Sequence, residues 1–144
     1  MSLHLLDVNV MVALHLPEHE AHSRVFEWFL RTGRKSFCTC ALTQAGFLRM
    51  MMNPVLTGEK ITLNEAQELL DSLVQQSGHG FLQMECSFRE AAAPFEDRIF
   101  GHRQITDAYL LGLAMRHKAK LATLDKAIVH LAGQQLSSHL ALIQ

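Results

Sequence analysis

Three aspartates, Asp7, Asp107 and Asp125, stand where their carboxylates could act together. Asp7 follows the short, mostly apolar run 3–6, and Asp125 follows a similar run at 120–123. Carboxylates that lie close together repel one another unless a cation neutralises them. Hard oxygen ligands favour Mg²⁺ or Mn²⁺, ions that keep several waters and bind phosphate oxygens. The chemistry that follows is metal-assisted hydrolysis of a phosphodiester.

Short apolar strands alternate with helices along the chain. We expect strands at residues 3–6, 36–40, 81–84, 120–123 and 140–143. We expect helices at residues 8–16, 18–31, 43–52, 62–76, 88–95, 107–117 and 126–131. Parallel strands are usually joined by helical crossovers, and both faces of a parallel sheet must be covered. This order therefore predicts an α/β fold, with three α/β/α layers and a central, mostly parallel sheet of four to five strands.

Threonines precede three of the expected helices. Thr43, Thr62 and Thr106 are suited to cap a helix by accepting a hydrogen bond from a backbone N–H of the first turn. In the second of these helices the apolar side chains recur at the helical period: Leu63, Ala66, Leu69, Leu70 and Leu73. The pattern predicts amphipathic helices packed on the sheet.

The position of the aspartates relative to the strands decides whether they can meet. An open parallel sheet binds ligands beyond the carboxyl ends of its strands, at the point where the strand order reverses. If the strands before Asp7 and Asp125 are neighbours there, the two carboxylates come together. Asp107 begins a helix in the same layer and can reach this crevice from a positive helix end. Each aspartate alone could instead be a helix cap, but three at one edge favour a shared metal site.

Four segments, in order, resemble the motifs of VapC-type PIN-domain toxins. They are 5–10 (LLDVNV), 42–49 (LTQAGFLR) leading to Asn53 and Pro54, 102–110 (HRQITDAYL) and 121–125 (LATLD). The resemblance spans nearly the whole chain, and its specificity lies in the ordered set because each motif alone is weak.

This resemblance implies a single PIN domain over residues 1–144 with Mg²⁺- or Mn²⁺-dependent endoribonuclease activity. The family consists of toxins of toxin–antitoxin pairs, so the implied partners are an RNA substrate, a cognate VapB-type antitoxin and a second copy in a homodimer. The antitoxins of such pairs place a C-terminal segment in the active-site groove. Asp7, Asp107 and Asp125 fall on acidic positions of the family and are the implied catalytic and metal-binding residues.

Gln44 departs from the family pattern, in which the residue after the threonine of the second motif is usually glutamate. An amide can offer an oxygen to a water bound to the metal, but it carries no charge and cannot act as a general base. We therefore expect weaker metal binding with catalysis retained. The alternative is a binding-only protein whose groove holds RNA or a peptide.

Other polar residues lie within the same motifs. Asn9 could hydrogen-bond a ligating carboxylate or a water at the metal, and a local turn or cap role is equally open to it. Thr106 could also contact the site, although a helix cap is its simpler role. Arg49 and Arg103 could contact RNA phosphates, although such residues usually remain solvated at the surface. A phosphatase that uses Asp7 as nucleophile is a third possibility. It is disfavoured because Asn9 stands where such enzymes carry a second aspartate.

The composition restricts the class of protein. With 144 residues, 49% hydrophobic and 19% charged, the chain predicts one globular domain. A formal net charge of −1 provides no overall positive field for nucleic acid, so binding must come from a local site. No run approaches the roughly 20 apolar residues of a membrane span, and Asp7 interrupts the first apolar run. We therefore expect a cytoplasmic protein with no membrane association.

The chain contains 3 cysteines. Cys38 and Cys40 would point to the same face of a strand, which is poor geometry for a disulfide. Nearby ligands for zinc are lacking, so we expect all the cysteines, including Cys86, to be buried packing residues.

Overall fold

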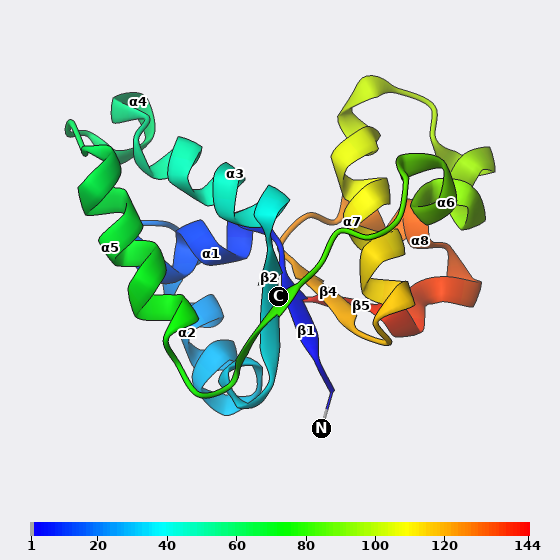
Figure 1. Cartoon of the computed structure of the whole chain (residues 1–144), viewed down its shortest axis with the longest axis horizontal. Coiled ribbons are helices and arrows are strands. Elements are labelled where there is room, and N and C mark those ends of the chain that lie inside the picture. Colours follow the sequence, from blue (N-terminus) through cyan, green and yellow to red (C-terminus); the bar gives the residue numbers. More distant parts are fainter. Residues whose placement is uncertain (1) are drawn as a thin grey trace.

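Five parallel strands form a central sheet in the computed structural model, which describes residues 2–144 (Figure 1). The strands are β1 (His4–Leu6), β2 (Phe37–Cys40), β3 (His79–Leu82), β4 (Lys120–Thr123) and β5 (Leu140–Leu142). Their spatial order is β3-β2-β1-β4-β5, and all four neighbouring pairs are parallel. The chain first builds the sheet outward from β1 to β3 and then returns to the other side of β1. The strand order therefore reverses between β1 and β4.

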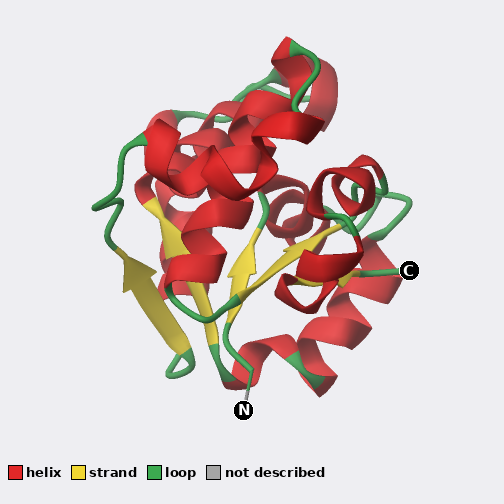
Figure 2. Cartoon of the chain, turned by 90° about the vertical axis from the view of Figure 1, so that its right-hand side faces the viewer, coloured by secondary structure: helices red, strands yellow, loops and turns green. Residues whose placement is uncertain are grey.

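Helices cover both faces of this sheet. The first half of the chain contributes α1 (Val8–His15), α2 (His22–Arg31), α3 (Ala41–Met51), α4 (Pro54–Thr57) and α5 (Leu63–Val74). The second half contributes α6 (Phe88–Ala92), α7 (Ile105–Arg116) and α8 (Ala127–Ala132). Figure 1 shows the two groups on opposite sides of the strands, and Figure 2 shows the strands side by side among the helices. The predicted three-layer α/β/α architecture is confirmed, and no helix within residues 2–144 is long and apolar enough to cross a membrane.

The strands alternate their side chains between two apolar cores. Leu6 and Phe37 face the core beneath α1, α2, α3 and α5, whereas Leu5 and Cys38 face the core beneath α7 and α8. Burial on both faces explains why these strands read as continuous apolar runs. The three cysteines are buried free thiols, as predicted from their number and spacing.

Helix starts were predicted less well than the elements themselves. Thr62 caps α5 as expected, because its Oγ1 accepts a hydrogen bond from Glu65 N at 3.2 Å. The predictions for Thr43 and Thr106 as caps are wrong. The helix α3 begins at Ala41, and Thr43 Oγ1 instead accepts from Cys40 N at 3.0 Å. Likewise α7 begins at Ile105, so Thr106 lies within the first turn.

Other element boundaries also differ from the prediction, two of them for reasons that the structure shows. The helix α2 begins at His22 rather than at residue 18, because residues 16–21 form consecutive turns. The third strand, β3, covers His79–Leu82 rather than 81–84, because pairing with β2 places Gly80 opposite Cys38. Glycine is a poor strand former on its own, so tertiary pairing overrides the local preference here.

The contact between α6 and α7 depends on Gly112. A methyl group at this position would overlap the carbonyl oxygen of Ala91 on α6. We expect Gly112→Ala to lower the free energy of unfolding by about 1–3 kcal/mol, because the two helices would have to move apart. Urea denaturation measures this change. Gly80→Ala is the matched control, since a methyl group there meets nothing within 4 Å, and equal stabilities of the two variants would contradict the prediction.

Candidate active site

The carboxyl ends of β1 and β4 lie side by side. These strands pair in parallel, with Leu6 opposite Ala122, so the chain leaves both strands at the same edge of the sheet. Asp7 follows β1 directly, and Asp125 lies two residues after the end of β4. The expectation that the two strands meet at the reversal of strand order is therefore confirmed.

Asp7 is a buried carboxylate with two hydrogen bonds. Its Oδ1 accepts from Val8 N at 2.8 Å at the start of α1, and its Oδ2 accepts from the hydroxyl of Thr123 at 2.7 Å. Only 7% of the residue is exposed. Burial raises the pKa of Asp7, the two hydrogen bonds oppose this increase, and the charge of Asp125 adds to it. Asp7 thus caps α1, and its ionised form is unfavourable because the carboxylate is buried.

Thr123 connects the polar groups at this edge. Besides donating to Asp7, its Oγ1 accepts from Asp125 N at 3.1 Å and from Asn9 Nδ2 at 3.3 Å. Asn9 Oδ1 in turn accepts from Leu124 N at 3.2 Å. Asn9 therefore stabilises the end of β4 and is linked to Asp7 through the hydroxyl of Thr123. Sequence analysis missed Thr123, although a hydroxyl at a strand end, two residues before an acid, was an available signal.

The hydroxyl of Thr123 should control the acidity of Asp7. We expect Thr123→Val to raise the pKa of Asp7 further, because Oδ2 loses its donor while burial persists. The free energy of unfolding should fall by about 1–3 kcal/mol, the cost of an unsatisfied buried acceptor. Carboxyl ¹³C titration by NMR and urea denaturation measure the two effects. Thr123→Ser retains the hydroxyl, and a titration of Asp7 that is the same in the valine and serine variants would contradict the assignment.

Asp107 reaches the same edge from the first turn of α7. Burial, followed by the charges of Asp7 and Asp125, raises the pKa of Asp107 to about 7. The three carboxylates therefore lie close enough to repel one another. Within residues 2–144, no donor hydrogen-bonds the Asp107 carboxylate, whereas Asp125 Oδ1 accepts from Ala127 N at 2.9 Å.

The donor set suits a divalent cation. It consists of carboxylate oxygens, and their mutual repulsion is unfavourable until a positive charge is added. The side chains are not already arranged as a metal cage, since residues 2–144 contain no group of three or more His, Cys, Asp or Glu gathered to hold an ion. Binding would therefore require Asp7, Asp107 and Asp125 to converge further.

Gln44 lies on the other side of β1. It is in the first half of α3, and its Nε2 donates a hydrogen bond to Thr39 Oγ1 on β2 at 3.0 Å. The carboxamide is thus held beside β2, which pairs with β1 on the side away from β4.

The remaining predicted residues lie on the surface. Thr106 and Arg103 are exposed at the start of α7, near Asp107 in the chain, whereas Arg49 is exposed in the last turn of α3.

Sequence analysis also missed Gln104. Its Oε1 accepts from Gly101 N at 3.2 Å and its Nε2 donates to the carbonyl oxygen of residue 98 at 2.9 Å, which fixes the loop before α7.

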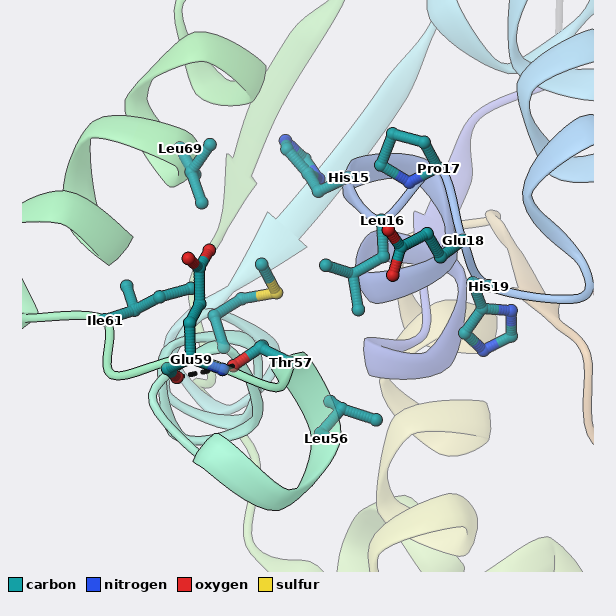
Figure 3. Close-up of a pocket in the computed structure, with 11 residues that line it drawn as sticks. His15, Leu16, Pro17, Glu18, His19, Leu56, Thr57, Glu59, Ile61 and Leu69 are labelled. Carbon is teal, nitrogen blue, oxygen red and sulfur yellow. Dashed lines mark hydrogen bonds between the residues drawn. The ribbon is translucent and has the colours of Figure 1, made fainter.

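A pocket of about 560 Å³ lies away from these carboxylates (Figure 3). It is bounded by the end of α1 and the following turn, by the end of α3, and by the segment from α4 to α5. Leu16 and Leu69 contribute apolar surface, and Glu18 and Glu59 are acidic. None of the three aspartates lines it, so the pocket is separate from the candidate active site.

Comparisons with known proteins agree with this architecture. The family model for the PIN domain matches residues 4–134. Ribonuclease VapC38 of Mycobacterium tuberculosis is 40% identical over 131 residues, which cover 91% of each chain. Ribonuclease VapC29 of the same species is 36% identical and is matched over 90% of each chain.

A solved structure shares the fold at low sequence identity. The crystal structure of VapBC2 from Rickettsia felis, bound to a DNA fragment from its promoter, aligns with a TM-score of 0.62 at 12% identity over 99% of each chain. At this identity the likeness concerns the fold. Together with the family model and the relatives, it shows that the chain belongs to the PIN-domain family, among its VapC-type members.

Proposed function

We propose that this protein is an Mg²⁺- or Mn²⁺-dependent endoribonuclease and the toxin of a toxin–antitoxin pair. The proposal is supported by Asp7, Asp107 and Asp125 near one sheet edge, where burial and then the charges of Asp7 and Asp125 raise the pKa of Asp107 to about 7. Relatives named as ribonucleases provide the substrate class. A cation would relieve the repulsion and would supply the positive charge that a chain with net charge −1 lacks.

The three aspartates would hold the ion. When bound, a divalent cation activates water and offsets negative charge that develops on the scissile phosphate. Thr123 keeps Asp7 oriented through its 2.7 Å hydrogen bond. Arg103 precedes α7 and is exposed beside the edge that carries Asp107, so we propose that it contacts an RNA phosphate. We propose the same role for Arg49, farther along α3, for RNA that extends beyond the cleaved bond.

A cleavage assay tests the proposed activity. Protein freed of any partner and incubated with cellular RNA and Mn²⁺ should produce fragments, and EDTA should prevent their formation because the cation is removed. Restoration of cleavage by excess Mg²⁺ or Mn²⁺ completes the test. RNA that remains intact under every metal condition would rule out the nuclease and favour the binding-only alternative.

Gln44 motivates that alternative, and its replacement separates the two functions. We expect Gln44→Glu to increase the affinity for Mn²⁺, because an additional carboxylate adds negative charge near the site. Isothermal calorimetry measures the affinity, and RNA cleavage at limiting Mn²⁺ should increase in parallel. An unchanged affinity would show that residue 44 does not influence the ion. Activity that appears only in the glutamate variant would identify the natural protein as a binder.

We also propose two protein partners: a VapB-type antitoxin and a second copy of the chain. The solved relative is a VapBC protein bound to promoter DNA, and this chain exposes apolar side chains that a partner could cover. Val55 on α4 is 91% exposed, and Leu56 and Leu63 lie nearby in the chain. Light scattering tests for a dimer, and co-purification with the product of any small reading frame next to the gene tests for the antitoxin. A monomer with no co-purifying protein would contradict both assignments.

A further inference from the structure

Three side chains from three different elements form a continuous line of hydrogen bonds beside the candidate site. Gln44 Nε2 on α3 donates to Thr39 Oγ1 on β2 at 3.0 Å. The same oxygen lies 2.8 Å from Nε2 of His79 on β3. The ring of His79 also packs against Phe37, with 5.4 Å between ring centroids. The line therefore joins Gln44, at the family's second acidic position, to an imidazole two strands away from β1.

The burial of the Thr39 hydroxyl determines which groups donate and which accept along this line of hydrogen bonds. Thr39 is 0% exposed, so water cannot accept its proton, and its oxygen already accepts from Gln44. A buried hydroxyl proton needs an acceptor, and within residues 2–144 the acceptor in reach is His79 Nε2. This nitrogen can accept only in the neutral ring whose proton is on Nδ1. The bonds therefore run from the Gln44 amide to the Thr39 hydroxyl and on to His79.

This direction determines which end of the Gln44 carboxamide stays free. With Nε2 held by Thr39, Oε1 is the end available to another group. If His79 donated to Thr39 instead, the hydroxyl proton would turn toward Gln44, and the amide would rotate to present its nitrogen outward. The tautomer of His79 thus selects between an oxygen and an NH₂ group at residue 44.

We propose that Thr39 and His79 are positioning residues that hold the Gln44 oxygen free to orient the attacking water. This inference rests on the proposed nuclease function. An uncharged amide cannot remove a proton, but its oxygen can accept a hydrogen bond and align water for attack on phosphorus. The helix α3 starts directly after β2, the strand that neighbours the Asp7-bearing β1. The replacement of glutamate by glutamine is therefore accompanied by neighbours that fix its orientation.

The first test requires neither metal nor RNA. In ¹⁵N NMR of the natural protein, the His79 imidazole should be neutral, with the proton on Nδ1 and Nε2 unprotonated. Thr39→Val should shift the Gln44 side-chain NH₂ resonances, because they lose their acceptor, whereas Thr39→Ser should leave them in place. A proton on Nε2 of His79, or Gln44 resonances that do not respond to Thr39→Val, would overturn the proposal.

The second test is a double-mutant cycle on RNA cleavage. Thr39→Val and Gln44→Ala should each lower kcat about tenfold with little change in KM, as expected for loss of an orienting contact. The double variant should be no slower than Gln44→Ala alone, because Thr39 acts through Gln44. His79→Asn, which can still accept with its side-chain oxygen, should retain more activity than His79→Leu.

The outcomes separate this inference from the proposed function. Additive losses of cleavage activity in the double-mutant cycle would overturn the positioning role while leaving the nuclease intact. The same would follow if the activity that Thr39→Val loses matched the fraction of that variant that urea denaturation finds unfolded. Absence of cleavage by the natural protein would overturn the nuclease and the role of Gln44 in it. In that case the NMR result still decides whether the line of hydrogen bonds exists.

Discussion

Replacement of Asp7 by asparagine is expected to reduce RNA cleavage about 1,000-fold, because several kcal/mol of charge stabilisation depend on the ligands of the ion. The substitution keeps the shape of the side chain. Asparagine Oδ1 can still accept from Val8 N. Its NH₂ group cannot accept the proton that the Thr123 hydroxyl donates to Asp7, and the hydroxyl oxygen already has two donors. The substitution therefore removes one negative charge and one hydrogen bond. Single-turnover cleavage rates at saturating Mn²⁺ measure the effect.

The same substitution should not destabilise the fold. Burial raises the pKa of Asp7, so its ionised form is disfavoured in the folded state and its contribution to stability is lost as the pH rises. We expect Asp7→Asn to unfold at a urea concentration at least as high as that of the natural protein at pH 8. Asp71→Asn, on the exposed face of α5, is the matched control and should keep full activity. An Asp7→Asn variant that cuts RNA at the natural rate would remove Asp7 from the site.

Stability in the absence of metal should fall as the pH rises from about 4 to about 7. The pKa of Asp107 is about 7 in the folded protein and 3.8 in its ordinary state. Between these values the folded state binds more protons than the unfolded state, so the free energy of unfolding decreases with pH. The decrease should be on the order of 1 kcal/mol, because the partly exposed carboxylate is screened by solvent and salt.

A divalent cation should reverse this trend. The ion requires deprotonated carboxylates, so its binding should strengthen as the pH passes about 7 and should release a proton from Asp107. Stabilisation by Mn²⁺, measured as a rise in Tm, should therefore be larger at pH 8 than at pH 6. Asp107→Asn should flatten the metal-free pH dependence, lower cleavage more than 100-fold and remove most of the metal effect. Equal Mn²⁺ effects at pH 6 and pH 8 in the natural protein would contradict this linkage.

The central strands β1, β2 and β4 were predictable because their burial leaves short, mostly apolar runs. Residues 120–123 were predicted exactly as the structure has them, and the run at 3–6 differs by one residue. Helix starts were harder to predict. The helices α3 and α7 begin one or two residues before Thr43 and Thr106. Several polar residues near a helix start can satisfy the same N–H groups, so local sequence leaves the first turn ambiguous.

The candidate site shows the same division between local and long-range information. The aspartates could be chosen from the sequence because each follows a strand or opens a helix. The role of Thr123 could not be predicted, because its partners Asp7 and Asn9 are more than a hundred residues away in the chain. The hydrogen bonds that join Gln44 to Thr39 and Thr39 to His79 could not be predicted either, because they depend on the pairing of β2 with β3.

The amino-acid sequence by itself determined the α/β class, the approximate elements and the positions of the acidic residues, because each follows from local periodicity and from the chemistry of single side chains. Only the tertiary structure decided that β1 and β4 are neighbours, that Asp7 is buried against Thr123 and that Gln44 is held beside β2. These features depend on strand order and on which face each side chain occupies. They arise when distant segments pack together, and neither local propensity nor spacing along the chain specifies them.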